Sequence, residues 1–197
     1  MSATKLPLVY LVRHGETEWT ISGRHTGRTD IPLTANGERT AIGLSGVLDG
    51  EAFASVLTSP LQRARRTAEL AGFGTRMAID GDLVEWDYGS YDGLRTSEIR
   101  AARPDWKLFE HGCPGGEVAA AVGVRADRVV ARIRSAPGGV LVFAHRDVLR
   151  VLIARWIGLD AREGRGFTLD PASVSVLGYD HGLDEPIVRR LNGLQRP

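Results

Sequence analysis

Three short, mostly apolar runs, each followed by a helix-forming segment, constrain the fold of this chain most strongly. The runs are Leu8–Val12, Ser55–Thr58 and Val140–Ala144. Short apolar runs of this kind are typical of strands that are buried on both faces. Strands that alternate with helices assemble into a mostly parallel sheet. The sequence therefore predicts an α/β fold, a three-layer sandwich in which helices flank a mostly parallel central sheet.

The helices are predicted from apolar periodicity and from residues that begin or end a helix. Thr34 can cap a helix that continues to Leu48, because Ala41, Leu44 and Leu48 recur at helical spacing. Two later helices are each expected to stop at a glycine. The remaining predicted elements are helices over Leu61–Ala71 and Val148–Ile157 and strands over Val174–Tyr179 and Ile187–Leu191.

The middle of the chain, over residues 86–125, has a different composition. It is rich in Gly, Pro, Trp and charged residues, and its helices are expected to be short. Since ligands of open α/β sheets bind beyond the carboxyl ends of the strands, we expect a small lid-like insertion there. A chain of 197 residues suits one domain, so residues 1–197 are predicted to form a single domain with this insertion.

Charge and cysteine content exclude several classes of protein. The formal net charge is +1, so the chain has no overall field for nucleic acid or a membrane surface. Cys113 is the only cysteine, so no internal disulfide can form, which fits a reducing compartment. No apolar segment is long enough to span a bilayer or to form a signal-peptide core. We expect a cytoplasmic protein; a homodimer is compatible with the sequence and stays open.

The first run ends in the tripeptide Arg13-His14-Gly15. Side chains alternate along a strand, so Arg13 and His14 can face one ligand only if the chain turns, and Gly15 permits a turn. A guanidinium matches the oxygens of a phosphate, and a neutral imidazole can act as a nucleophile or a base. The tripeptide alone is equally compatible with a solvated strand end.

The second run is followed by Ser59-Pro60 and by a helix that carries Arg63 in its first turn. Arg63 would lie near a helix N-terminus, where anions bind readily. Arg65 and Arg66 fall on other faces of this helix and are expected to be solvated. The arginine run is short and lacks interleaved aromatic residues, so we do not interpret it as a nucleic-acid site.

The third run ends in a second histidine, His145. Two histidines and two arginines make a poor metal site, because the arginines repel the cation and no Asp or Cys lies at ligand spacing. The same four residues, His14, His145, Arg13 and Arg63, suit a phosphate dianion. No metal and no other cofactor is predicted.

The stretch LVEWDYGSYDG holds the candidate proton donor. Glu85 follows two apolar residues and precedes an aromatic-rich turn, so partial desolvation can raise its pKa and suit it to proton donation. A surface glutamate beside Trp86 is the alternative interpretation, and Asp87 is the competing carboxyl group.

These four stretches, in this order, resemble the motifs of the histidine phosphatase superfamily, also called phosphoglycerate mutase-like. They read LVRHGETEW, TSPLQRARRTA, LVEWDYGSYDG and VFAH, and the resemblance covers nearly the whole chain. The stretches GRHTGRTDIPLT, EWDYGSYDG and PDWKLFEHGCPGGE resemble bacterial broad-range acid phosphatases and the fungal sedoheptulose-bisphosphatase branch. The middle segment is shorter than in phosphoglycerate mutases, which favours hydrolysis.

The resemblance implies a role for each of these residues. His14 would be the nucleophile that becomes phosphorylated, and Glu85 would protonate the leaving oxygen and then help to activate water. Arg13, Arg63 and His145 would hold the phosphoryl oxygens. Fixed cationic donors stabilise the charge of phosphoryl transfer, and a covalent phosphohistidine splits the displacement into two steps.

One pair of residues departs from the family pattern. The family usually has glycine directly after the second histidine, whereas this chain has Arg146 and Asp147. Arg146 would narrow the pocket, add a contact to the substrate or point away. Asp147 would either cap the following helix or repel a phosphate dianion, with loss of activity.

Substrate specificity is expected to come from two loops at the outer rim of the pocket. His25 lies in the stretch GRHTG and His111 in the stretch EHGCPGGE, where glycines allow close approach to a ligand. Such residues suit sugar hydroxyls or a second phosphate. The predicted substrate-binding residues are Arg13, Arg63, His145, Thr20, His25, Thr26, Gly27, His111 and Arg146.

Three functions remain open at this point. The first, which we favour, is a phosphomonoesterase that hydrolyses a small phosphorylated metabolite, a sugar phosphate or bisphosphate. The second is a phosphoglycerate mutase, which would form an isomer instead of free phosphate. The third is a catalytically weak phosphatase fold that binds phosphate esters, because Arg146 and Asp147 alter the site.

Overall fold

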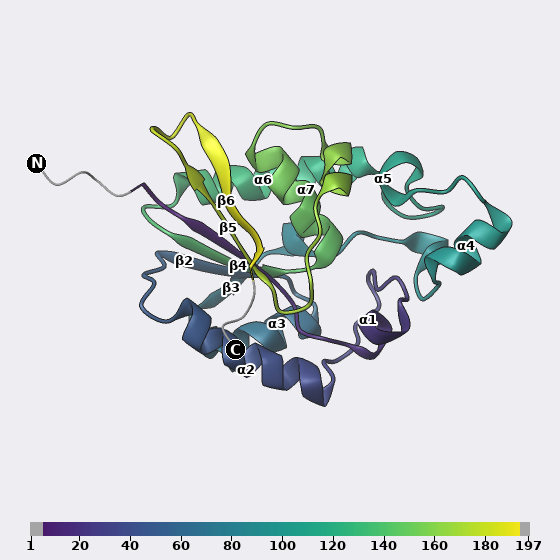
Figure 1. Ribbon diagram of the computed structural model, residues 1–197, viewed down its shortest axis with the longest axis horizontal. Helices are drawn as coiled ribbons and strands as arrows, with labels where there is room; N and C mark the ends of the chain where they lie inside the picture. The colour runs from purple at the N-terminus through teal and green to yellow at the C-terminus, as the bar shows by residue number, and fades with distance from the viewer. Residues whose placement is uncertain (1–5, 194–197) are drawn as a thin grey trace, which may run out of the picture.

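The central sheet of the computed structural model, which describes residues 6–193, has six strands in the order β3-β2-β4-β1-β5-β6 (Figure 1). Neighbouring strands from β3 to β1 in this order are parallel, whereas β5 pairs antiparallel with β1 and β6 antiparallel with β5. The predicted α/β class with a mostly parallel sheet is confirmed. The strands are β1 (Val9–Arg13), β2 (Ser55–Thr58), β3 (Met77–Ile79), β4 (Val140–Ala144), β5 (Val174–Tyr179) and β6 (Pro186–Gly193).

Helices lie on both faces of this sheet and beyond its carboxyl ends. The α-helices are α1 (Glu18–Ser22), α2 (Ala35–Leu48), α3 (Gln62–Ala68), α4 (Thr96–Ala102), α5 (Leu108–His111), α6 (Ala119–Ser135) and α7 (Arg146–Trp156). The other helical turns are η1 (Glu69–Phe73), η2 (Gly81–Leu83), η3 (Gly89–Tyr91) and η4 (Ala161–Gly166). In Figure 1, α4 and α5 lie to the right of the sheet, beyond the ends of β1 and β4.

Side chains that alternate along the strands build one core on each face of the sheet. Val9, Leu11 and Val142 pack in the core that includes α6 and α7. Val12 and Phe143 point to the opposite face and pack in the core that includes α2 and α3. Each of the five is at most 2% exposed, and burial of such a side chain stabilises the fold by about 1.5–3 kcal/mol. The predicted three-layer arrangement therefore holds.

Local signals set the ends of the helices on the second face. The Thr34 hydroxyl accepts a hydrogen bond of 3.0 Å from Gly37 N and caps α2, as predicted. The helix predicted over Leu61–Ala71 is regular only to Ala68, after which η1 follows. Gly72 lies inside η1 with a φ of 92°, a conformation that favours glycine and ends the helical path.

Helices α6 and α7 also differ from the prediction. The long helix α6 is missing from the predicted elements, and it begins at Ala119, before the expected end of the insertion at residue 125. Its buried residues Val122, Val129 and Ile133 join the core, so residues 119–125 belong to the helical layer. Helix α7 begins at Arg146, two residues earlier than predicted.

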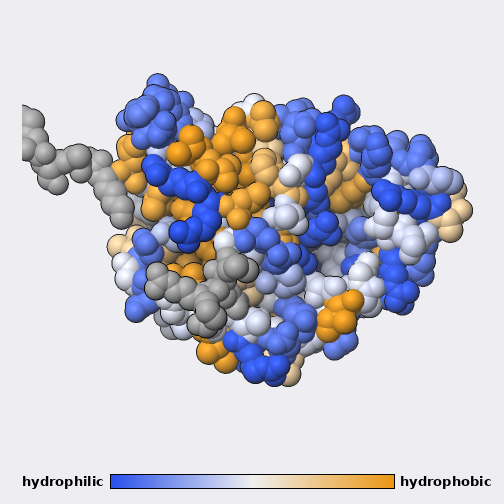
Figure 2. Space-filling view, in the orientation of Figure 1, coloured by the Kyte–Doolittle hydropathy of each residue, from blue (hydrophilic) through white to orange (hydrophobic). Residues whose placement is uncertain are grey.

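The surface differs between the sheet and the region beyond it. Figure 2 shows hydrophobic side chains gathered over β1, β5 and β6, whereas the region around α4 is mostly hydrophilic. Among residues 6–193, every helix falls short of the length and apolarity that crossing a lipid bilayer requires.

The register of the sheet brings three strand ends to one place. Arg13 lies opposite Ala144 in the β1–β4 pair, and β2 pairs with β4 on its other side. The residues that directly follow the three strands are His14, Ser59 and His145. They emerge side by side, because parallel strands present their carboxyl ends at the same edge of a sheet.

Candidate active site

The two predicted histidines face each other at this edge. The ring centroids of His14 and His145 lie 5.1 Å apart, and the side chains are 3% and 0% exposed. The two residues come from positions far apart in the sequence, and the β1–β4 pairing alone brings them together.

Hydrogen bonding selects one tautomer of His14. Its Nδ1 lies 2.7 Å from the carbonyl oxygen of Gly15, which can only accept, so Nδ1 carries the proton. Nε2 then keeps its lone pair, and no group of the described residues hydrogen-bonds to it. Burial, together with the charges of Arg63 and Arg13, lowers the pKa of His14 well below its ordinary value. The ring is therefore neutral at physiological pH.

Gly15 is needed for space rather than for an unusual backbone conformation. A Cβ at this position would lie 2.6 Å from the carbonyl oxygen of Gly37 in the first turn of α2. The Gly15 N–H donates to the Thr67 hydroxyl at 3.1 Å, which ties the residue to α3. The turn expected at Gly15 is thus held by close packing against two helices.

Both ring nitrogens of His145 are engaged within the protein. Nε2 lies 2.7 Å from the Ser59 hydroxyl, and Nδ1 accepts a hydrogen bond of 3.1 Å from Nε of Arg63. Burial and the charge of Arg63 lower the pKa of His145 well below its ordinary value. His145 is therefore also neutral and fixed in orientation.

Arg63 is fully enclosed and holds the loop that follows α1. Its Nη atoms donate to the carbonyl oxygens of Thr26, Gly27 and Thr29 at 3.3, 2.9 and 3.0 Å. With the bond to His145, these contacts leave one of the five guanidinium N–H groups without a protein acceptor. Burial lowers the pKa of Arg63.

Arg13 carries a buried donor that has no partner. Its Nη1 donates to the carbonyl oxygen of Leu169 at 2.6 Å. Its Nε is buried and lacks a hydrogen-bond partner within residues 6–193. Burial and repulsion by Arg146 lower the pKa of Arg13 to about 10, which keeps it cationic at neutral pH. A buried cationic donor without an acceptor is costly, so the position suits an anion.

Glu85 is buried against the N-terminus of α7. Its carboxylate accepts from the N–H groups of Trp86, Asp147 and Val148 at 2.8, 3.1 and 2.9 Å. Burial and the negative charge of Asp147 raise the pKa of Glu85, against these three bonds, which favour the carboxylate. Its charge also acts on Arg13 and Arg63, so the three groups share one site.

The competing carboxyl group, Asp87, points elsewhere. One of its oxygens accepts from Gly89 N at 2.9 Å, and the other lies 3.8 Å from Nε of Arg28. Its side chain is 36% exposed. Asp87 therefore holds the turn after Glu85, and within the described residues it forms no hydrogen bond or ion pair with the residues at the strand ends.

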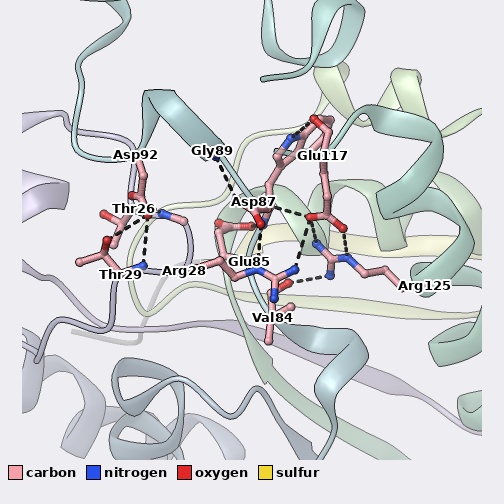
Figure 3. A network of polar contacts seen from close by, with 12 residues as sticks. Thr26, Arg28, Thr29, Val84, Glu85, Asp87, Gly89, Asp92, Glu117 and Arg125 are labelled. Carbon is pink, nitrogen blue, oxygen red and sulfur yellow. Dashed lines mark hydrogen bonds and ion pairs between the residues drawn. The ribbon is translucent and has the colours of Figure 1, made fainter. Parts of the chain in front are cut away.

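An ion pair between the buried Arg125 and the partly buried Glu117 holds the loop that carries Glu85 (Figure 3). Arg125 contacts the carboxylate of Glu117 with Nε at 2.9 Å and Nη2 at 3.0 Å. Its Nη1 donates to the carbonyl oxygens of Asp82 and Val84 at 2.8 and 2.6 Å. Glu117 in turn accepts from the N–H of Asp87 at 2.8 Å. The pair thus fixes the backbone on both sides of Glu85, at Val84 and at Asp87.

We predict that Arg125→Met lowers the free energy of unfolding by about 1–3 kcal/mol, since it leaves the carbonyl oxygens of Asp82 and Val84 without their donor and leaves Glu117 with Arg28, at 4.0 Å, as its remaining ion-pair partner. Arg128→Met is the matched control, because Arg128 lies on the same helix and forms an exposed ion pair with Asp82. Denaturant unfolding followed by tryptophan fluorescence measures both variants. An equal loss of unfolding free energy in the two variants would show that the Arg125–Glu117 pair stabilises the fold no more than an exposed ion pair does.

The pair that departs from the family pattern is arranged in a defined way. Asp147 does not cap α7, as His145 occupies the N-cap position and the helix begins at Arg146. The Asp147 carboxylate accepts from the Tyr88 hydroxyl and from Nη1 of Arg150, the latter at 2.6 Å. Although burial acts to raise it, the charges of Arg146 and Arg150 hold the pKa of Asp147 below its ordinary value.

Arg146 forms no ion pair with a described carboxylate, and it lines a pocket beside the strand ends together with His25. The His25 ring stacks on Tyr88 with centroids 4.6 Å apart, and its Nε2 lies 3.1 Å from the Thr96 hydroxyl. Gly27 lies where a Cβ would approach the Trp86 carbonyl oxygen to 3.0 Å, so it serves close packing.

Two predicted substrate-binding residues lie elsewhere. The Thr20 hydroxyl accepts from Thr17 N at 2.9 Å and donates to the Thr17 carbonyl, so it completes the capping box of α1, whose N-cap residue is Thr17. His111 lies at the end of α5, where Nδ1 accepts from Lys107 N at 3.0 Å and Nε2 lies 3.7 Å from Asp105. Local hydrogen bonds hold both side chains, and neither lines the pocket that contains His25.

The structure also adds residues that the sequence analysis did not assign to the site. They are Ser59, Tyr88, Glu117, Arg125 and Arg150. A signal existed for Arg125, which falls at helical spacing within the apolar stripe of residues 122–133 and therefore needed a buried partner. The others depend on contacts between distant segments.

The strand ends do not offer a metal site. Within the described part of the chain, the one group with suitable spacing is Asp180, His181 and Glu185. This group lies exposed in the turn between β5 and β6, away from the histidine pair. At the strand ends, the guanidinium groups of Arg13 and Arg63 disfavour a cation and favour an anion.

Several known proteins are similar to this chain. The sequence profile of the Histidine phosphatase superfamily (branch 1) matches residues 9–192. The chain is 43% identical over 192 residues to an acid phosphatase of Mycobacterium tuberculosis, covering 95% of this chain and 94% of the relative. It is 34% identical over 245 residues to sedoheptulose 1,7-bisphosphatase of Saccharomyces cerevisiae, covering 91% and 90%. The solved structure of the open reading frame Rv3214 of M. tuberculosis matches with a TM-score of 0.91 at 38% identity, covering 98% of this chain and all of that one.

Proposed function

The chain belongs to the histidine phosphatase superfamily, and from this premise we propose that it is a metal-independent phosphomonoesterase acting through a phosphohistidine. Its relatives named as phosphatases support a phosphatase activity. One observation carries the finer proposal: the free Nε2 of a neutral His14 lies among buried guanidinium groups, and Arg13 Nε has no acceptor. A phosphate ester supplies both the electrophile and the missing acceptor.

In the first step, Nε2 of His14 attacks the phosphorus atom, and a P–N bond forms as the ester P–O bond breaks. Arg13 and the uncommitted N–H of Arg63 stabilise the negative charge of the phosphoryl oxygens. The neutral His145 ring contributes an N–H donor once its Nε2 exchanges the contact with Ser59 for one with a phosphoryl oxygen. The two guanidinium groups, Arg13 and Arg63, supply the positive charge that a metal ion supplies in other phosphatases. Glu85 gives its proton to the leaving oxygen, which is released as an alcohol.

In the second step, the Glu85 carboxylate takes a proton from water, and the water oxygen attacks the phosphorus atom. The P–N bond breaks, which returns His14 and releases inorganic phosphate. The raised pKa of Glu85 suits both halves of this cycle, because the group must hold a proton before the first step and accept one in the second.

The surroundings of Asp147 argue against the third function, a catalytically weak phosphatase fold in which Asp147 repels the phosphate dianion. Its negative charge is matched by the buried pair with Arg150 and by the Tyr88 hydroxyl. This pairing offsets part of the repulsion of a phosphate dianion for which the alternative was raised, and so supports a working enzyme. We therefore propose a working hydrolase, acting on a small phosphate ester such as a sugar phosphate.

A substrate panel tests the proposal. Phosphate release is measured from sugar phosphates, sugar bisphosphates, nitrophenyl phosphate and 3-phosphoglycerate, the last also by isomer formation. Release of free phosphate from several esters supports the hydrolase. Isomer formation without phosphate release supports a mutase, and saturable binding without turnover supports a binding protein.

The pH profile of kcat/KM should be bell-shaped, with an acidic limb set by His14 and a basic limb set by Glu85. The lowered pKa of His14 places the acidic limb of kcat/KM below 6.5, and the raised pKa of Glu85 places the basic limb above 4.5. Profiles are compared for glycerol phosphate with the wild type and with Glu85→Gln. The second ionisation of the substrate, near pH 6, is common to both. A basic limb that is unchanged in Glu85→Gln would contradict the assignment.

A further inference from the structure

A pocket of about 270 Å³ adjoins the candidate active site. It is lined by residues of α4, of α5 and its flanks, and of the first turns of α7. Arg146 and Asp147, which line it, directly follow His145 in the chain. The Asp147 N–H donates to the Glu85 carboxylate at 3.1 Å, so this part of the lining adjoins the phosphoryl site. The pocket is therefore an extension of that site.

The cations that line this pocket outnumber the anions that neutralise them. Asp147 is engaged by Arg150 at 2.6 Å. Glu110 is engaged by Lys107 at 3.1 Å and by Arg165 at 3.6 Å. Both lining carboxylates are thus committed to other lining cations, and an excess of positive charge remains.

Two guanidinium groups of the lining, Arg100 and Arg146, have no carboxylate partner among the described residues, whereas Arg165 also pairs with Glu163 outside the lining. Arg100 donates from Nε to the carbonyl oxygen of Trp106 at 3.0 Å and forms no ion pair with a described carboxylate. Arg146 likewise has no carboxylate partner in the part of the chain that the structure covers. Two forked donors from different helices, α4 and α7, suit the oxygens of a phosphate dianion better than those of a monoanion.

The remaining wall of the pocket is apolar. Trp106, Leu108 and Phe109 line it, and burial lowers the pKa of His25, which keeps that ring neutral. An apolar wall beside two guanidinium groups matches a short carbon skeleton that ends in an anion. The volume leaves little room for more, since sites for drug-sized ligands occupy about 300–1,000 Å³.

We infer that this pocket is a second phosphate subsite, in which Arg100 and Arg146 bind the far phosphate of a small sugar bisphosphate. The inference rests on the proposed function, because the first phosphate must lie at His14. It makes Arg146, where the family usually has glycine, a specificity-determining residue. A carboxylate at the far end of the substrate is the competing occupant of the same charge.

The test compares kcat/KM for substrates that differ in their second anion. The probes are fructose 1,6-bisphosphate, fructose 1-phosphate, fructose 6-phosphate, 3-phosphoglycerate and nitrophenyl phosphate. The wild type should prefer the bisphosphate over either monophosphate by about tenfold or more, the size of effect that a charge-assisted hydrogen bond gives. Arg100→Gln and Arg146→Gly should each reduce this preference about tenfold. Arg103→Gln, just beyond the end of α4 and outside the pocket lining, is the matched control and should keep it.

The remaining outcomes decide against the inference. A wild type without preference for the bisphosphate, or variants that keep the full preference, would overturn it while leaving the proposed function intact. An equal preference for 3-phosphoglycerate would assign the pocket to a carboxylate instead. If no ester is hydrolysed, the proposed function fails, and the subsite is judged by calorimetry with fructose 1,6-bisphosphate. Arg100→Gln must then weaken binding about tenfold, or the subsite fails as well.

Discussion

The variant His14→Ala is expected to lose phosphatase activity almost completely, with kcat lowered by about 10³-fold or more. Nε2 of His14 is the one free imidazole nitrogen at the strand ends, because Nδ1 is held by Gly15 and both nitrogens of His145 are engaged. Loss of this atom removes the covalent route and leaves only direct attack by water. Release of nitrophenolate measures the effect.

The control for this variant is His181→Ala. His181 lies exposed in the turn between β5 and β6, so its loss should leave both folding and turnover unchanged. Thermal unfolding of His14→Ala distinguishes loss of the nucleophile from loss of the fold. A folded His14→Ala that kept more than about one hundredth of the wild-type rate would be incompatible with a nucleophilic His14.

The variant Glu85→Gln is expected to lower kcat about 10²–10⁴-fold for esters of poor leaving groups, which is the range that general acid catalysis supplies. Glycerol phosphate needs a proton on its leaving oxygen, whereas nitrophenolate departs without one. The loss should therefore be much smaller with nitrophenyl phosphate. The ratio of kcat/KM for the two substrates is the measurement.

Asp87→Asn serves as the matched control for Glu85→Gln. Asp87 lies two residues further on and holds the Gly89 N–H, so its replacement should affect both substrates alike and to a smaller extent. Equal losses for the two leaving groups in Glu85→Gln would exclude Glu85 as the proton donor. A leaving-group effect in Asp87→Asn would transfer the role to Asp87.

The parts of the site that lie at strand ends could be predicted from the sequence. An apolar run that stops at His14 or His145 marks both a strand and its carboxyl end, and parallel pairing then brings the two ends together. Arg63 was placed correctly in the first turn of a helix. These residues are predictable because each follows from a local pattern and from one rule of sheet topology.

Residues that depend on distant partners could not be predicted in the same way. Asp147 has the pattern of a helix cap, but Tyr88 and Arg150 engage it, and Glu85 accepts from the helix N–H groups in its place. The apolar residues of α6 recur at helical spacing, although this helix was not among the predicted elements. Arg125 interrupts the apolar face with a charge, and its partner, Glu117, precedes the helix. Their pairing exists only once the chain has folded.

A phosphoryl group carried by His14 is the central intermediate of the proposed mechanism, and trapping it is the most direct test. Rapid quench of the wild type with phosphorus-labelled nitrophenyl phosphate should yield an acid-labile, base-stable phosphoprotein. Peptide mapping and phosphorus NMR should place the label on Nε2 of His14, because Nδ1 donates to the Gly15 carbonyl. Turnover without any labelled protein, or a label on another residue, would contradict the account.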